Sequence, residues 1–236
     1  MMPFEKYDNK HFNEGITLGG RHSFRDLNLY IKSRKIEAPK KNISRVSVPF
    51  SNGFYDFSTI SGEATYSERK IEYEIDIIAE SPEELELRRS IFLNWAMTVN
   101  DSRIDDDALS NYHFIGSFDS VNFSDDETGE KTTATLSFVC QPFKVENNPT
   151  IVDVSWGSGE IANSGMPVLP YIETPTGTVL SVNYSAESYV VPAQGPGEPP
   201  FRLPVPLITG ENVVTAASPG EGVKANVKVI FYREVL

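Results

Sequence analysis

The chain has 236 residues, of which 39% are hydrophobic and 11% aromatic, and this composition indicates an ordered protein with one large or two small domains rather than a disordered chain. Its formal net charge of -12 repels phosphate backbones. Because the Lys and Arg residues also form no basic stripe, nucleic acid is excluded as a direct, sequence-specific partner.

Cysteine usage and hydropathy indicate the compartment in which the chain folds. A single cysteine, Cys140, excludes an internal disulfide framework and a thiolate metal cage, which indicates a reducing cytoplasm. Residues 1–10 contain no apolar core of signal-peptide length, and no later stretch approaches the roughly 20 apolar residues that span a bilayer. We therefore expect neither ordinary secretion nor membrane insertion.

The strongest strand pattern covers residues 70–79. Apolar side chains alternate there with carboxylates, which is the period of a sheet with one face in water; the apolar positions are Ile71, Tyr73, Ile75 and Ile77. This segment predicts a strand with one face in the core.

One helix is predicted next. Ser81, Pro82 and Glu84 form a capping box with proline at the first helical position, and the helix should run to about Val99. At 100° per residue, one broad stripe gathers the apolar side chains Leu85, Leu87, Ile91, Phe92, Trp95 and Val99. We expect this stripe to be core, with Trp95 as its anchor.

After an acidic segment at residues 101–107, interpreted as a solvated loop, two extended segments predict a β-hairpin. They cover residues 112–123 and 131–143 and are separated by turn-forming residues 124–130. In the second arm one face carries Thr132, Ala134, Leu136, Phe138 and Cys140. The Cys140 thiol is therefore expected to be buried and inert.

A change in composition at Pro142 and at Asn147-Asn148-Pro149 predicts a domain boundary, with domains at 1–145 and 146–236. Short extended runs predict a small β-sandwich after it, at residues 151–156, 168–173, 178–184, 187–191, 211–216 and 223–232. The proline-rich residues 192–206 should form a stiff, extended connection or edge. The expected fold class is mainly β with one helix: an α+β N-terminal domain and a C-terminal sandwich.

The chain carries no recognisable catalytic motif. It lacks the serine elbow and the phosphate loop, and Gly157-Ser158-Gly159 has only half of a dinucleotide fingerprint. The histidines His11, His22 and His113 have no zinc-ligand spacing, and residues 101–107 lack the glycine and glutamate of a calcium loop. We assign no catalytic, cofactor-binding or metal-binding residue and expect no enzymatic activity.

Residues 35–58 read KIEAPKKNISRVSVPFSNGFYDFS, with Pro39-Lys40-Lys41 and Val48-Pro49-Phe50 followed by an aromatic run. Further along come Arg69 at the start of the predicted strand, Leu93-Asn94-Trp95 in the helix and residues 138–143 closing the hairpin. In these segments, and more loosely at Asn163-Ser164-Gly165, 168–172, Gly210-Glu211-Asn212 and Phe231-Tyr232-Arg233, the chain resembles the distal tail protein (Dit) family of siphophages.

This resemblance implies a structural virion protein. The N-terminal domain would be related to tail-tube subunits and would assemble as a homo-hexameric ring around a DNA channel, with stacked rings possible in the family. The C-terminal domain would be a galectin-like β-sandwich, here in the short form without an inserted carbohydrate-binding module. The ring would act as a baseplate hub at the phage tail tip, between the tail tube protein and a tail-associated lysin or fibre protein, after synthesis in the host bacterial cytoplasm.

Two other function classes stay open. Galectin-like sandwiches bind glycans in other proteins, so a carbohydrate-binding module is the main alternative, with Trp156 as the tryptophan on which a sugar would stack. A peptidoglycan hydrolase is less well supported, because the Cys/His pair or zinc set of such enzymes is not evident.

A ring subunit must present two different surfaces to its neighbours. Residues 48–57 place four aromatic side chains around Gly53, which is more than one loop buries locally, and aromatic residues are enriched in interface cores: Phe50, Phe54, Tyr55 and Phe57. We expect these four residues to lie in an oligomer interface. The alternative is that Pro49 and Gly53 turn the chain inward and the aromatics fill the domain's own core.

Overall fold

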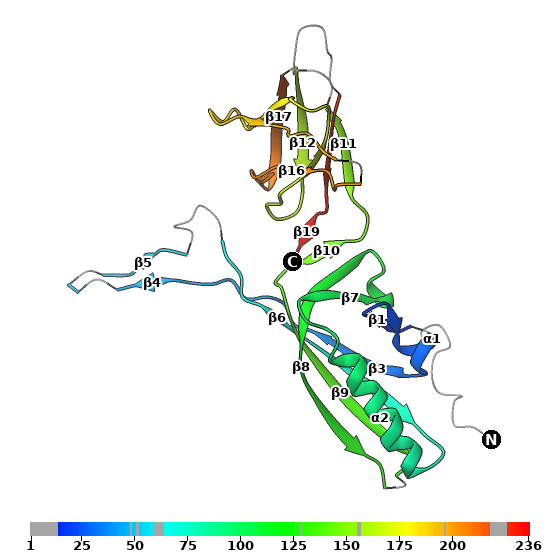
Figure 1. The fold of residues 1–236 in the computed structure, drawn as a ribbon. Coiled ribbons are helices and arrows are strands. Elements are labelled where there is room, and N and C mark those ends of the chain that lie inside the picture. The colour runs from blue at the N-terminus through cyan, green and yellow to red at the C-terminus, as the bar shows by residue number, and fades with distance from the viewer. Residues whose placement is uncertain are drawn as a thin grey trace. The chain divides into compact units, whose positions relative to one another are not determined.

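The structure is a computed structural model, and it describes residues 14–47, 49–50, 52–58, 64–127, 129–154, 157–195, 197–217 and 226–236 (Figure 1). The chain forms two compact units, Met1–Lys144 together with Leu236, and Val145–Val235. Strands dominate both, as the sequence predicted for the fold class. None of the helices in the described ranges is long and apolar enough to cross a membrane.

The first unit is built on one antiparallel sheet. Its elements are β1 (Ile16–Leu18), β2 (Arg21–His22), α1 (Ser23–Leu27), β3 (Tyr30–Ile36), β4 (Arg45–Val46), β5 (Tyr55–Asp56), β6 (Arg69–Ile78), α2 (Pro82–Ala96), β7 (Ser102–Asp106), the 3-10 helix η2 (Asp107–Leu109), β8 (Tyr112–Asp125) and β9 (Lys131–Cys140). The main sheet has the order β2-β1-β7-β8-β9-β6-β3.

The centre of this sheet confirms the predicted strand and hairpin. β6 pairs with β9 along its whole length, which sets Ile71 opposite Phe138 and Tyr73 opposite Leu136. The apolar face of β6 is fully buried, and so is the face of β9 that ends at Cys140. The alternation of apolar and polar side chains therefore accounts for both strands and for the face of each that packs in the core.

Helix α2 begins as its capping box predicts. The Ser81 hydroxyl accepts a hydrogen bond from the Glu84 N–H (3.2 Å), and the Glu84 carboxylate accepts one from the Glu80 N–H (2.9 Å). These bonds satisfy N–H groups that the first turn leaves without helical partners. The helix ends at Ala96, three residues before the predicted end. Beyond it, the N–H groups of Thr98 and Val99 donate to the carbonyls three residues earlier, those of Trp95 and Ala96.

The predicted apolar stripe of α2 is only partly correct. Leu85, Phe92 and Trp95 are buried, but Leu87 is 61% exposed and Ile91 is 42% exposed. Leu87 and Ile91 lie on the side of the helix toward α1, where they line a groove instead of meeting the sheet. On the other side of the helix, the Arg89 guanidinium lies over the Phe123 ring and pairs with Asp125. The prediction that Leu87 and Ile91 are core residues was wrong.

The expectation of a single helix was also wrong, because α1 is a second one. Its N-cap is His22, whose Nδ1 accepts hydrogen bonds from the N–H groups of Phe24 (3.1 Å) and Arg25 (3.0 Å). Histidine is not among the usual capping residues, so no pattern in the sequence predicted the start of this helix. Asn28 ends the helix in the left-handed conformation, with φ 55°.

Residues 102–106 form strand β7, not the predicted acidic loop. β7 pairs with β1 on one side and with β8 on the other. The buried Asp106 carboxylate accepts hydrogen bonds from the Arg34 Nε, at 3.0 and 3.1 Å, and from the Ala108 N–H at 3.0 Å, and these compensate for its loss of water. Ile104, which lies in β7 two residues before Asp106, is buried in the apolar core of the first unit.

Strands β4 and β5 form a separate two-stranded arm. The arm continues the β3–β6 pair beyond Ile36 and Arg69, through a hydrogen bond from the Glu37 N–H to the Lys70 carbonyl and a bridge between Lys41 and Tyr66. Farther out, Arg45 pairs with Asp56 and Val46 with Tyr55.

The second unit is a β-sandwich. Its elements are β10 (Lys144–Glu146), β11 (Thr150–Val154), β12 (Gly157–Asn163), β13 (Tyr171–Glu173), β14 (Val179–Val182), β15 (Tyr189–Val190), β16 (Phe201–Arg202), β17 (Gly210–Ala217), β18 (Val227–Phe231) and β19 (Glu234–Val235). Two four-stranded sheets, β11-β18-β13-β16 and β12-β17-β14-β15, enclose an apolar core that includes Ile172, Val214 and Phe231.

Within this sandwich the sequence analysis did not predict β12, but it correctly predicted an extended edge in the proline-rich residues 192–206. β12 begins with Gly157-Ser158-Gly159, whose glycines hide the strand pattern, and it pairs with β17 over its whole length. β16 lies inside residues 192–206 and is an edge strand, where a lack of N–H donors is tolerated.

Candidate oligomer interface

The four aromatic residues singled out from the sequence lie on the β4–β5 arm. Phe50 is fully exposed, Tyr55 is 58% exposed, Phe54 56% and Phe57 42%. None of them belongs to the buried core of the first unit. In the monomer, therefore, these side chains do not fill the domain's own core.

Both faces of the arm carry apolar surface. Because side chains alternate along a strand, Ile43 and Phe54 share one face with the Arg45–Asp56 pair, and Val46, Tyr55 and Phe57 share the other. Ile43 is 61% exposed and Val46 is 49% exposed. The Arg45 guanidinium lies 4.3 Å from the centre of the Phe54 ring and 3.5 Å from the Asp56 carboxylate, so the arm's charges satisfy each other.

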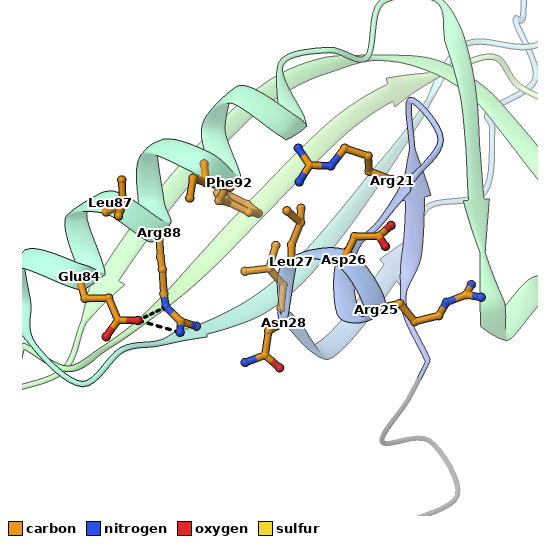
Figure 2. Close-up of a pocket in the computed structure, with 11 residues that line it drawn as sticks. Arg21, Arg25, Asp26, Leu27, Asn28, Glu84, Leu87, Arg88 and Phe92 are labelled. Atoms are coloured by element: carbon orange, nitrogen blue, oxygen red, sulfur yellow. Dashed lines mark hydrogen bonds and ion pairs between the residues drawn. The ribbon is translucent and has the colours of Figure 1, made fainter.

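A second feature of the first unit is a groove between α1 and α2. It has a volume of about 430 Å³ and combines aliphatic side chains with charged ones (Figure 2): its lining is Arg21, Arg25, Asp26, Leu27, Asn28, Leu29, Glu84, Leu87, Arg88, Ile91 and Phe92. The Arg88 guanidinium is paired with the Glu84 carboxylate at 2.8 Å across one helical turn. The exposed Leu87 and Ile91 form an apolar ledge along this groove.

The acidic residues 105–107 are each held by protein groups. Asp105 is paired with Arg103, Asp106 with Arg34, and Asp107 accepts hydrogen bonds from His22 Nε2 (2.8 Å) and the Gly15 N–H (3.1 Å). Burial acts to raise the pKa of Asp107, but these hydrogen bonds outweigh it, and the pKa is lowered. Among the described residues no group of three or more His, Cys, Asp or Glu side chains could hold a metal ion.

The described histidines and the single cysteine are buried in the first unit. His22 is buried as the α1 cap, His113 is buried in β8, and His11 lies outside the described residues, as does Trp156. Burial raises the pKa of the Cys140 thiol to about 12, although the nearby Arg69 acts to lower it. The prediction of a buried Cys140 is confirmed.

The fold of the two units, a sheet with a helix packed on it followed by a β-sandwich, is shared with a solved phage distal tail protein. The SPP1 Dit protein, described as a paradigm of the hub adsorption apparatus in phages that infect Gram-positive bacteria, superposes with a TM-score of 0.69 at 12% identity, over 94% of this chain and 99% of that one. The resemblance predicted from the sequence is thus confirmed for the fold.

Two further solved structures are less similar. One is a chain from the tail of an empty GTA particle, with a TM-score of 0.32, 11% identity and coverage of 57% of this chain and 94% of that one. The other comes from the phage P2 baseplate in its activated conformation, with a TM-score of 0.35, 8% identity and coverage of 87% and 92%. No protein-family model and no curated protein sequence matches the chain.

Proposed function

We propose that this chain is a non-enzymatic structural subunit of a long-tailed phage, and that six copies form a ring that serves as the hub at the tail tip. The observation that carries the proposal is the fold shared with the SPP1 hub protein over nearly the full length of both chains. In this proposal the ring connects the tail tube protein to the tail-tip, lysin or fibre protein, and the protein resides in the virion.

The exposed arm supports ring formation. A cyclic assembly requires two different, complementary surfaces on each subunit. The arm offers one, because its aromatic side chains are exposed in the monomer and interfaces are enriched in such residues. Phe50, Phe54, Tyr55 and Phe57 are accordingly proposed to contact an adjacent subunit.

The polar face of the central sheet supports a DNA channel. On β6 and β8, Glu72 is paired with Lys35 (2.9 Å) and Lys70 (3.2 Å), and Asp119 with Lys70 (3.7 Å). On β9, Thr135 lies opposite Glu74, and Thr133 lies opposite Asp76, to which its hydroxyl donates a hydrogen bond (2.7 Å). Lysines that are already paired attract phosphate only weakly, so such a surface lets DNA slide past without holding it.

The mass of the purified protein in solution tests this function. Light scattering over a range of concentrations should show a species of about six times the 26.3 kDa chain mass at the higher concentrations. A monomer at every concentration, at moderate salt, would contradict the proposal.

Glycan binding stays as the alternative. It depends on Trp156, which lies outside the described residues, so the structure adds no observation in its favour. Binding on a glycan array by the full chain would support this alternative.

A further inference from the structure

The turn at the tip of the β4–β5 arm contains the one Asn-Gly pair of the sequence, Asn52-Gly53. Both residues are exposed, and they lie beyond the last described pair of the arm's ladder, Val46 with Tyr55. Gly53 has a φ of 105°, which glycine adopts without strain, so the pair suits a turn. Asparagine is also a chemically labile residue, and the residue after it determines how fast it reacts.

The reaction is an attack by the backbone nitrogen of the following residue on the asparagine side-chain carbonyl. At Asn52 the Gly53 nitrogen forms a bond to Cγ, its proton passes through water to the side-chain amide, the Cγ–Nδ2 bond breaks, and ammonia leaves. Water then opens the five-membered imide at either of its carbonyl carbons. The products are aspartate and isoaspartate, and in isoaspartate the main chain runs through Cβ and Cγ. Water is the only co-reactant.

The fold leaves both reacting groups accessible. A Cβ built on Gly53 would meet nothing within 4 Å in the described part of the chain, so no neighbouring group shields the attacking nitrogen. None of the hydrogen bonds found among the described residues engages the Gly53 N–H or the Asn52 side chain. Because no bond to the protein has to break first, the attack needs only rotation of the Asn52 side chain.

Asn163 shows the opposite surroundings. It precedes the small residue Ser164, but it is fully buried, and its side-chain Nδ2 donates to the Met166 and Leu207 carbonyls at 2.8 and 3.0 Å. Losing this amide as ammonia would leave two buried carbonyls without their donor. The fold therefore protects Asn163, and it gives Asn52 no such protection.

Asn42 shows the effect of the following residue. It is exposed like Asn52, but it precedes Ile43, whose branched side chain crowds the backbone nitrogen. Its Nδ2 also donates to the Thr65 hydroxyl at 3.2 Å. Exposure alone is thus not sufficient, and at Asn52 exposure coincides with a following glycine.

We propose that Asn52-Gly53 is a modification site at which the folded chain converts Asn52 to aspartate and isoaspartate without an enzyme. The change adds a negative charge to a chain whose formal net charge is already -12. The arm's Arg45 is already paired with Asp56, so it is not free to neutralise the new carboxylate.

The effect of the modification on assembly rests on the proposed function. In that function the exposed aromatic side chains on either side of the turn, Phe50 and Phe54 among them, contact an adjacent subunit. A carboxylate in such a contact loses water without gaining a partner, which weakens the contact. Chains that stay unassembled therefore lose their ability to assemble with age, whereas the contact shields Asn52 in chains that have joined a ring.

Peptide mapping of the full chain measures the modification. Trypsin cleaves after Arg45 and Arg69, and the peptide between them contains Asn52 and no other asparagine or glutamine. After a week at pH 8 and 37 °C in heavy-oxygen water, at least half of this peptide should be aspartate and isoaspartate forms that carry one heavy oxygen. Peptide 42–45 of the same digest, which contains Asn42, is the internal control and should stay unchanged.

The same measurement in urea separates the role of the fold from that of the dipeptide. The folded chain should react at a rate within tenfold of the unfolded chain, because nothing in the described fold restrains the reacting groups. An unchanged peptide, or a folded chain that reacts more than tenfold more slowly than the unfolded one, would overturn the inference.

Light scattering of two variants distinguishes this inference from the proposed function. Asn52→Asp should form rings at least tenfold less than Asn52→Gln, which keeps a neutral amide, and both should melt like the wild type because the residue is exposed. Equal ring formation by the two variants would overturn the effect on assembly. Monomers of the wild type at every concentration would overturn the proposed function, while the peptide map alone decides the modification.

Discussion

Trp95 shows how much of one residue's role is visible from the sequence and how much depends on the fold. Its side chain is 3% exposed, lies beside Phe92 and donates a hydrogen bond from Nε1 to the Arg21 carbonyl at 3.1 Å. Helical periodicity predicted the burial. The hydrogen bond ties α2 to β2, and no sequence pattern links residues that far apart.

Trp95→Ala should therefore destabilise the first unit by about 3–5 kcal/mol, because it removes a buried aromatic side chain and leaves the Arg21 carbonyl without its donor. Leu87→Ala is the matched control: the same predicted stripe contains it, but its exposed side chain should cost less than about 0.5 kcal/mol. Urea denaturation of both variants measures the difference, and similar midpoints would show that the assigned helix face is wrong.

Cys140 is a second residue whose chemistry is set by its surroundings. The thiolate is the reactive form, and burial raises the pKa of this thiol to about 12, so it stays protonated at pH 8. A maleimide reagent should leave native protein unlabelled over an hour at pH 8 and should label one thiol per chain in denaturant. Rapid labelling of the native protein would contradict the packing of β9 described above.

At the scale of elements, the sequence predicted those with strong local signals. β6, β9 and the start of α2 followed from alternation and a capping box, and each is confirmed. α1 and β7 were missed because their stability comes from distant partners. The His22 cap is held by Asp107, 85 residues away, and Asp106 in β7 is neutralised by Arg34, 72 residues away.

The His22–Asp107 contact predicts a dependence of stability on pH. The pKa of Asp107 is lowered in the folded state, so its contribution is present above the unfolded value of about 3.9 and is lost as the pH falls through the folded value. Asp107→Asn should lower the free energy of unfolding at pH 7, and the gap from the wild type should shrink at a pH well below the unfolded value of about 3.9. Chemical denaturation at both pH values measures the gap, and an unchanged gap would exclude the ionised carboxylate as its source.

Removing exposed aromatic side chains from the β4–β5 arm should prevent assembly without unfolding the chain. Replacing Phe54 and Tyr55 together by serine should give a folded monomer, because both side chains are exposed and outside the core. Far-UV circular dichroism checks the fold and light scattering the assembly. Ile151→Ser on the second unit is a matched exposed control that should assemble normally. Intact rings of normal stability from the Phe54/Tyr55 variant would remove the arm from the interface.

For the whole molecule, the fold class and the resemblance were predicted from the sequence, whereas the exposure of the proposed interface residues became visible only in the structure. From the sequence alone, four aromatic residues on a loop fit the domain's own core or an interface equally well. In the structure they are exposed on an arm that its own unit does not cover, which excludes the domain's own core. The α1–α2 groove had no sequence signal at all, since α1 was not predicted and Leu87 was assigned to the core.

We propose that copies of this chain form a closed ring of six with an open centre. Class averages from negative-stain electron microscopy of the purified full-length protein test it most directly. We expect end-on views with sixfold symmetry and a central channel, and we expect these views to disappear in the Phe54/Tyr55 serine variant. Closed dimers, open filaments or isolated monomers under conditions where the protein is folded would contradict it.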